Sequence, residues 1–145
     1  MQKINVVCVG KIKEEYLRSA IAEYLKRLSR FAKVEIKELL EGKTFKEEAE
    51  PILKSAKGFK IALCVEGERL SSEDFAQKIK SLCDKGEEIS IIIGSSCGLD
   101  KSVKDAADLK LSFSDMTFPH QLMRVILLEQ VYRAFMINSG SEYHK

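Results

Sequence analysis

The sequence of 145 residues lacks tryptophan and has only two prolines, eight glycines and four cysteines. So little proline and glycine excludes collagen-like and low-complexity chains, and a hydrophobic content of 45% excludes intrinsic disorder. The cysteines form no C-x-x-C pair and lie far apart, which favours reduced thiols over a disulfide framework or a zinc site. We therefore expect one domain that builds its core from apolar side chains, without a metal.

Long hydrophobic runs are also missing. No apolar run approaches the roughly 20 residues that a transmembrane helix needs. The first one, residues 4–9, is too short for the core of a signal peptide, and no cleavage site follows it. The protein is therefore expected to be cytoplasmic, with no membrane partner.

The chain has little net charge, because 24 Lys and Arg residues are set against 22 Asp and Glu residues, which gives a formal charge of +2. A near-neutral total argues against binding a polyanion by bulk charge. However, residues 1–60 carry 14 basic and nine acidic side chains, whereas residues 61–110 carry seven and ten. This basic excess is compatible with a basic surface patch, although solvated helix faces are the more usual explanation.

Short β-branched runs alternate with longer stretches of helical spacing along the chain. Strands are expected at residues 4–9, 34–36, 61–65, 89–93 and 109–113. Helices are expected at residues 14–30, 46–56, from Ser71 or Ser72 to about Leu82, 102–107 and 121–137. This order predicts one α/β domain over residues 1–145, with helices around a mostly parallel sheet.

The runs at residues 61–65 and 89–93 are apolar throughout, which is typical of strands covered on both faces. Parallel sheets bind ligands at the carboxyl ends of their strands, so the loops at residues 66–68, 94–98 and 114–120 are candidate site segments. The loop at 94–98 has neither G-x-G-x-x-G spacing nor a P-loop lysine, and a structural turn explains it equally well. The apolar residues of the loop at 114–120 would either wrap an adenine or plug the sheet.

The chain has two histidines. His120 lies near the start of the last predicted helix, where a positive charge is disfavoured, and this favours a neutral imidazole in a structural hydrogen bond. His144 follows Tyr143 in a polar tail that is typical of a frayed terminus. A Ser-His-Asp hydrolase is excluded because the sequence has no G-x-S-x-G motif.

The last predicted helix, residues 121–137, is apolar on all sides. After its first position only Arg124, Glu129, Gln130 and Arg133 are polar, and they form no continuous polar face. One side of such a helix packs on its own sheet, and in a thin domain the other side needs a cover. We therefore expect a two-fold homodimer built on this helix, the alternative being an unusually deep core helix.

Four segments carry a resemblance to a known family: INVVCVGKIKEEYLRSAIAEYLKRL, IIIGSSCGLD, LSFSDMTFPHQLMRVILLEQVYRAF and the final SEYHK. In this order and at these spacings they closely resemble the RlmH family of ribosomal RNA methyltransferases, which are minimal SPOUT methyltransferases. The most specific features are T-F-P-H before a helix, R-V and Q-V-Y-R-A within that helix, and the terminal Y-H-K. The resemblance covers essentially the whole chain. The loop departs from some relatives, with Ser95-Ser96-Cys97 where Gly-Pro-Glu is common, and this leaves its side-chain roles open.

The resemblance implies an α/β sheet whose C-terminal segment threads a trefoil knot, in a homodimer. General topology rules would not predict that knot. It also implies that S-adenosylmethionine donates a methyl group to N3 of a pseudouridine in 23S rRNA within the assembled ribosome. The implied cofactor-binding residues are Leu63, Gly94, Phe113, Ser114, Asp115, Met116, Thr117 and Phe118. The catalytic candidates are Tyr143 and His144, which match the family's tail at the target base.

Methyl transfer is an in-line displacement that mainly needs a near-attack geometry and no metal. The N3 proton must be removed or shared, and charge that develops on the ring carbonyls must be stabilised. We expect His144 to accept the proton or to hydrogen-bond a carbonyl, Tyr143 to position the base, and Arg124 or Arg133 to contact phosphate or carbonyl oxygens. A non-catalytic nucleotide- or RNA-binding α/β module is the alternative.

Overall fold

The computed structural model describes residues 1–95 and 98–144. Five parallel strands form one sheet in the order β2-β1-β4-β3-β5. The strands are β1 (Gln2–Val9), β2 (Ala32–Leu39), β3 (Phe59–Arg69), β4 (Ile89–Ile93) and β5 (Leu109–Ser112). The helices are α1 (Glu15–Leu28), α2 (Phe45–Ser55), α3 (Ser72–Asp84), α4 (Lys101–Ala106) and α5 (His120–Asn138). The predicted α/β fold with a parallel sheet is confirmed.

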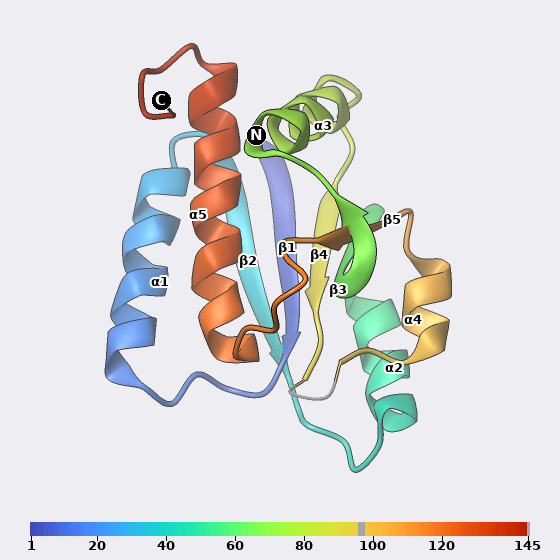
Figure 1. Ribbon diagram of the computed structural model, residues 1–145. Coiled ribbons are helices and arrows are strands. Elements are labelled where there is room, and N and C mark those ends of the chain that lie inside the picture. Colours follow the sequence, from blue (N-terminus) through green and yellow to red (C-terminus); the bar gives the residue numbers. More distant parts are fainter. Residues whose placement is uncertain (96–97, 145) are drawn as a thin grey trace.

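The sheet is covered on both faces, with α1, α3 and α5 on one side and α2 and α4 on the other (Figure 1). Side chains of β1 alternate between the two cores: Val6 and Cys8 pack on the α1–α5 side, and Val7 and Val9 on the α2–α4 side. All five residues of β4 are buried. A strand covered on both faces gains stability from apolar side chains in both directions, which explains the continuous apolar runs of the sequence.

Side-chain caps explain where three helices begin. The Thr44 Oγ1 accepts a hydrogen bond from the Glu47 N–H at the start of α2, and the Ser71 Oγ accepts one from the Asp74 N–H at the start of α3. At α4 the cap is Asp100, whose carboxylate accepts from the Ser102 N–H, so this helix begins one residue earlier than predicted. None of the helices in the described ranges combines the length and the apolar content that crossing a membrane requires.

The strand β3 is longer than the predicted run at residues 61–65. Its first half pairs with both neighbours, and its register against β5 then shifts between Leu63 and Glu68. Gly67 lies so close to the backbone of Leu111 that a Cβ atom there would be 2.8 Å from the Leu111 N and C atoms. The bulged residues 64–67 leave the sheet at its carboxyl edge, and Val65 is 47% exposed. The predicted burial on both faces therefore holds only for the first half of the strand.

The helix α5 packs between α1 and α3 and is buried on one side only. Arg124, Leu127, Leu128, Val131 and Ala134 form its buried face. The opposite face, which we call the outer stripe, consists of Leu122, Ile126, Glu129, Arg133 and Met136 at alternating spacings of four and three residues. Leu122 is 36% exposed, and the other four are partly exposed. The deep core helix is therefore wrong, because this helix lies at the surface of the chain.

Candidate active site

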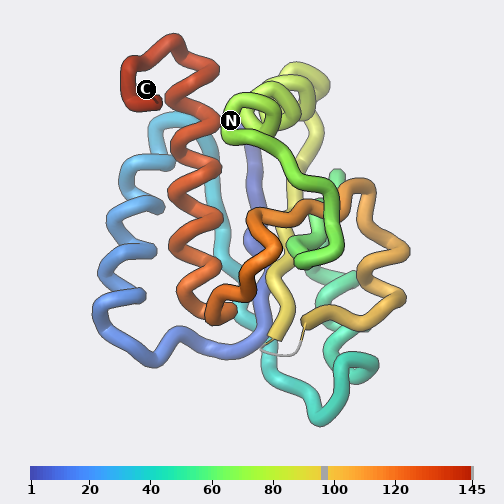
Figure 2. The backbone as a smooth tube through the Cα atoms, viewed as in Figure 1, coloured from blue at the N-terminus to red at the C-terminus, as the bar shows by residue number. Residues whose placement is uncertain are grey.

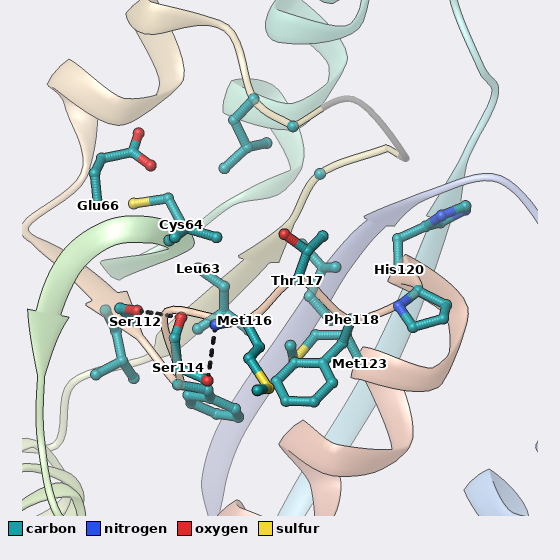
Figure 3. A pocket seen from close by; sticks show the side chains of 18 of the residues that line it. Leu63, Cys64, Glu66, Ser112, Ser114, Met116, Thr117, Phe118, His120 and Met123 are labelled. Carbon is teal, nitrogen blue, oxygen red and sulfur yellow. Dashed lines mark hydrogen bonds between the residues drawn. The ribbon is translucent and has the colours of Figure 1, made fainter.

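A cavity of about 680 Å³ opens at the carboxyl ends of β3, β4 and β5 (Figure 3). Its walls come from the end of β3, from the loop after β4 and from the segment that joins β5 to α5. This is the edge at which parallel α/β sheets bind ligands, and the volume lies within the range of small-molecule sites. The three loops singled out from the sequence thus contribute to one cavity.

Most of the predicted cofactor-binding residues meet in this cavity. Seven of the eight line it: Leu63, Gly94, Phe113, Ser114, Met116, Thr117 and Phe118. The eighth, Asp115, is not among the lining residues, and its carboxylate forms an ion pair with Arg69 at 2.7 Å. Met116 is 75% exposed, so the segment after β5 is not a hydrophobic plug under the sheet.

Two hydrogen bonds fold the segment after β5 into a tight turn. The Ser112 hydroxyl donates to the Ser114 carbonyl oxygen at 3.1 Å, and the Ser114 hydroxyl oxygen accepts from the Met116 N–H at 2.9 Å (Figure 3). Short side chains that bond to nearby backbone are typical of turns. The turn holds Met116 and Thr117 in the cavity wall, and the chain then enters α5 at His120, which also lines the cavity.

Gly94 allows the loop after β4 to close on itself. A Cβ atom at this position would fall well inside the contact distance of the Gly98 carbonyl oxygen. The loop is closed further by the Gly98 N–H, which donates to the Ser95 carbonyl oxygen at 2.9 Å. Any side chain at residue 94 would therefore push the loop out of shape. The departure at Ser96 and Cys97 lies outside the described residues.

The rim of the cavity carries an ion pair between Glu66, in the bulge of β3, and Lys104 on α4. The hydrogen bond from Lys104 lowers the pKa of Glu66, so this carboxylate is ionised at neutral pH. Lys104 was not predicted, because no local signal relates a lysine in a short helix to a strand end almost 40 residues earlier. Burial raises the pKa of the Cys64 thiol, which also lines the cavity, so this thiol is not an activated nucleophile.

The predicted catalytic pair lies elsewhere. The Tyr143 hydroxyl donates to Glu129 Oε2 at 2.7 Å, and the His144 Nε2 lies 2.8 Å from Glu73 Oε1. The cavity is at the other end of α5, where His120 lines it, and the 13 residues from there to Arg133 span about 20 Å. Within one copy of the chain, the tail therefore lies apart from the predicted cofactor residues.

The contacts of the tail define the hydrogen-bond roles of its side chains. An arginine can only donate, so the Nδ1 of His144, 3.0 Å from Arg133 Nη1, is the acceptor, and Nε2 is the ring nitrogen that faces Glu73 as a donor. The hydrogen bond to Glu129 raises the pKa of Tyr143 to about 12. This phenol is consequently protonated at neutral pH and is suited to donate a hydrogen bond rather than to act as a base.

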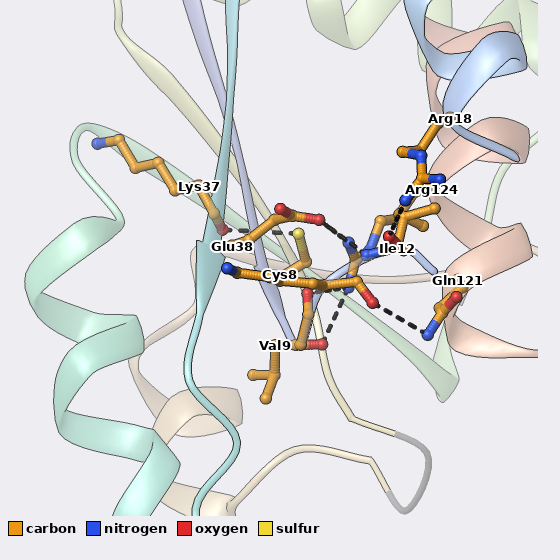
Figure 4. A network of polar contacts seen from close by, with 10 residues as sticks. Cys8, Val9, Ile12, Arg18, Lys37, Glu38, Gln121 and Arg124 are labelled. Atoms are coloured by element: carbon orange, nitrogen blue, oxygen red, sulfur yellow. Dashed lines mark hydrogen bonds and ion pairs between the residues drawn. The ribbon is translucent and has the colours of Figure 1, made fainter. Parts of the chain in front are cut away.

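The prediction that Arg124 contacts RNA is wrong, because its side chain is 0% exposed. Its guanidinium binds Glu38 and the end of β1 inside the protein (Figure 4). Arg133 has 26% of its side chain exposed and remains available. Within residues 1–95 and 98–144, no three His, Cys, Asp or Glu side chains are placed to hold a metal ion, and Cys8, Cys64 and Cys83 are free.

A parallel α/β sheet with its cavity at the carboxyl ends of three neighbouring strands is a small-molecule-binding architecture that many enzyme classes share. The family described as "Predicted SPOUT methyltransferase" matches residues 2–144, and the chain belongs to this family. The protein is thus a methyltransferase, as the resemblance predicted.

Relatives of similar length carry a more specific name. Proteins called "Ribosomal RNA large subunit methyltransferase H" are 49% identical to this chain in Streptococcus equi subsp. zooepidemicus and 51% identical in Clostridium novyi. The first match covers 99% of this chain and 99% of the relative, and the second covers 98% and 99%. The predicted RlmH resemblance is confirmed by these names.

Solved structures show the same fold at low sequence identity. A probable methylase family protein from Haemophilus influenzae Rd KW20 has a TM-score of 0.55 at 11% identity, over 96% of this chain and 67% of that chain. A probable methyltransferase from Bordetella pertussis Tohama I has a TM-score of 0.53 at 10% identity, over 92% of this chain and 96% of that chain. These two similarities support the fold alone.

Proposed function

We propose that this protein transfers a methyl group from S-adenosylmethionine to rRNA of the large ribosomal subunit, at N3 of a pseudouridine in 23S rRNA. The observation that carries the proposal is the cavity in which seven of the eight predicted cofactor-binding residues meet. The shared length and roughly half-identical sequence of the relatives named for this rRNA support the choice of substrate. A protein with this role works where ribosomes are, in the cytoplasm.

The cavity suits S-adenosylmethionine chemically. An adenine needs apolar walls, which Leu63, Leu111 and Phe118 provide. Ribose hydroxyls need an acceptor, which the ionised Glu66 at the rim provides. Gly94 has no side chain that would keep a ligand away from the backbone. When bound, the cofactor supplies a methyl group on a sulfonium that is already a good leaving group.

The remaining task is to orient the target base and to remove its N3 proton. His144 can accept this proton or a hydrogen bond at Nδ1, which requires that Arg133, the donor to Nδ1 within one copy of the chain, first release this nitrogen. Tyr143 keeps its own proton and can donate to a ring carbonyl or stack on the base. In both roles the tail must reach the cavity, which lies at the opposite end of α5 from the tail.

A second copy of the chain would bring a tail to each cavity. The outer stripe of α5 leaves Leu122, Ile126 and Met136 at the surface, which favours a partner there. We propose a two-fold homodimer packed on this stripe, in which the tail of each copy completes the site of the other. A stable monomer in analytical ultracentrifugation at micromolar concentration would contradict the dimer.

Subunit mixing tests the shared site. One variant, Gly94→Val, has a defective cavity and an intact tail, and a second variant ends at Glu142 and has an intact cavity. If the tail acts on the other copy, mixing two inactive variants restores about a quarter of the wild-type rate, because half of the dimers hold one complete site. If the tail acts within its own copy, the mixture stays inactive.

We also propose that the chain is knotted. The strand β5 is at the edge of the sheet, whereas α5 lies over its middle beside α1, so residues 113–119 cross the carboxyl edge between them (Figure 2). The bulged end of β3 pairs with β5 on one side of this crossing. Threading of residues 113–119 through the loop after β3 gives the trefoil knot of the proposed fold. A crystal structure in which this segment passes outside the loop would contradict it.

The cellular test is mass spectrometry of 23S rRNA from a strain that lacks the gene. The proposal predicts the loss of one methyl group from one pseudouridine and its return with a plasmid copy of the gene. Unchanged rRNA in the deletion strain would contradict the proposed substrate. Calorimetry with S-adenosylmethionine separately tests the cofactor, because a module that binds only RNA should produce no heat.

A further inference from the structure

We propose that the loop between β1 and α1, residues 10–14, is a rigid phosphate-binding element for rRNA. Lys11 and Lys13 would contact the RNA backbone beside the cofactor cavity, and the buried Arg124 would act as the positioning residue that holds them there. This inference rests on the proposed function, since it assigns the RNA contact of the same site.

The loop is held by four side chains from three different elements, α1, β2 and α5 (Figure 4). The Nη2 of Arg124 donates to the Val9 carbonyl oxygen at 2.9 Å and to the Gly10 carbonyl oxygen at 2.8 Å. Three further hydrogen bonds follow along the loop: Gln121 Nε2 to the Lys11 carbonyl oxygen, Arg18 Nη1 to the Ile12 carbonyl oxygen, and the Ile12 N–H to Glu38 Oε2. Each residue from Val9 to Ile12 thus has a backbone group fixed by a distant side chain.

Burial of the charged Arg124 side chain costs free energy, which argues that this residue has a role beyond packing. It is completely buried, and its Nη1 forms an ion pair with Glu38 at 2.8 Å. Taking a charge out of water costs several kcal/mol, and an apolar side chain of similar volume is often the more stable choice. Within the described residues, the Nε of Arg124 has no acceptor at all. Instead, its hydrogen bonds to the Val9 and Gly10 carbonyl oxygens fix the backbone conformation of the loop.

The loop presents two exposed lysines at the site. Lys11 and Lys13 are exposed, and neither forms an ion pair with any part of the chain that the structure describes. The loop lies next to the cavity, because Gln121, which holds the backbone of Lys11, directly follows the cavity residue His120. Flexible ammonium groups on a fixed backbone, next to a methyl-donor site, match the phosphates that flank a target nucleotide.

Nearby carboxylates affect the positive electrostatic potential around Lys11 and Lys13. Glu38 is paired with Arg124, and Glu15 is paired with Arg18 at 2.9 Å. Glu41 is close to the loop, since a Cβ atom on Gly10 would lie 2.9 Å from its Oε1. Removing the charge of Glu41 should therefore strengthen RNA binding, whereas removing the charge of the lysines should weaken it.

The first experiment measures binding of the full-length protein to purified large ribosomal subunits at several salt concentrations. Lys11→Gln/Lys13→Gln should lower the slope of log affinity against log salt by about 1.5, because two phosphate contacts are lost. Glu41→Gln should raise the affinity. The matched control is Lys57→Gln/Lys85→Gln, which removes two exposed lysines at the opposite edge of the sheet and should leave the slope unchanged.

The second experiment separates positioning from a general structural role. Arg124→Lys keeps the charge but has one nitrogen where arginine uses two, so it cannot hold Glu38 and the two carbonyl oxygens from separate atoms, and it should raise the KM for ribosomal subunits several-fold with little change in kcat. If Arg124 acts through the lysines, this rise disappears when Arg124→Lys is added to Lys11→Gln/Lys13→Gln. An equal rise in both backgrounds would assign Arg124 to the stability of the fold alone.

The outcomes distinguish the inference from the proposed function. If the wild-type protein transfers no methyl group to rRNA, the proposed function fails. If the wild-type protein is active and the lysine variant keeps the wild-type affinity and salt slope, the inference fails and the function stands. Calorimetry with S-adenosylmethionine should give the same affinity for the wild-type protein and the lysine variant, because both cavities are intact.

Discussion

Polar groups are arranged differently at the two edges of the sheet, where the strands begin (the amino edge) and where they end (the carboxyl edge). At the amino edge, Asn5 Nδ2 donates to Glu88 Oε2 at 2.6 Å and to Ser90 Oγ at 3.3 Å, and Ser90 in turn donates to the Lys57 carbonyl oxygen. These groups bind one another, and within the described residues only the buried Oδ1 of Asn5 is left without a partner in this network. At the carboxyl edge, the bulge of β3 and the turn after β5 hold the chain apart around a cavity.

The difference shows how one fold separates stability from function. Polar groups that satisfy each other contribute to folding and have little left for a ligand. Polar groups that surround a cavity are free to bind one, and loops there can vary without disturbing the strands. Substitutions at the amino edge should therefore change stability, and substitutions at the carboxyl edge should change binding and rate.

The largest expected effect is that of Gly94→Val at the carboxyl edge. The new side chain cannot fit against the Gly98 carbonyl, so the loop shifts into the cavity, and we expect the affinity for S-adenosylmethionine to fall at least about 100-fold. Calorimetry measures this affinity. The control is Gly86→Ala near the amino edge, where φ is +71° and there is open space. It should lower stability by about 1 kcal/mol and leave the affinity unchanged.

The converse prediction concerns Asn5→Ala at the amino edge. This change removes both hydrogen bonds of a fully buried amide and leaves its partners incompletely paired. We expect a loss of about 2 kcal/mol in the free energy of unfolding, measured by urea denaturation. The rate of methyl transfer at saturating substrates should be unchanged below the unfolding transition. A rate that fell together with stability would show that the two edges are not independent.

A smaller effect is expected at Glu66. Glu66→Gln should weaken binding of S-adenosylmethionine about tenfold, since a charged acceptor is replaced by a neutral one. The hydrogen bond from Lys104 lowers the pKa of Glu66, so the wild-type affinity should be lost only as the pH falls through this lowered pKa. In Lys104→Gln the loss should begin at higher pH. Calorimetry between pH 4 and 7 would contradict this role if both proteins gave the same profile.

The smallest expected effect concerns the titration of the Tyr143 phenol. The pKa of Tyr143 is raised to about 12, so the hydrogen bond to Glu129 stabilises the docked tail fully below pH 10, and this contribution is lost as the pH rises from 10 through 12. Tyrosinate absorbance of the wild-type protein minus that of Tyr143→Phe should show one phenol titrating near 12. In Glu129→Gln the same phenol should titrate lower, and a value near 10 in the wild-type protein would show that the tail is not docked.

The sequence predicted most of the fold because both sides of the sheet are buried. Continuous apolar runs such as Ile89–Ile93 are strong signals for inner strands. The second half of β3 was missed because the polar run after Val65 has no strand pattern of its own and is held by its pairing with β5. Local propensity cannot report such a long-range partner.

The candidate site was only partly predictable for the same reason. Motif resemblance located the cavity wall, since those residues follow one another after a strand. It gave no hint of Lys104, which reaches the rim from another helix, or of Arg124, whose partner Glu38 is 86 residues away. A lone arginine in an apolar helix suggested an RNA contact, whereas its burial shows that it acts inside the protein.

The most direct test of the central claim is methyl transfer by the purified components. Large ribosomal subunits from the deletion strain are incubated with the protein and S-adenosylmethionine labelled on its methyl group, and the rRNA is digested and its nucleosides identified. The account predicts one label per subunit, on N3 of a pseudouridine, with none when Gly94→Val replaces the wild-type protein. Label on another nucleoside, or unlabelled rRNA with a folded protein that binds the cofactor, would contradict it.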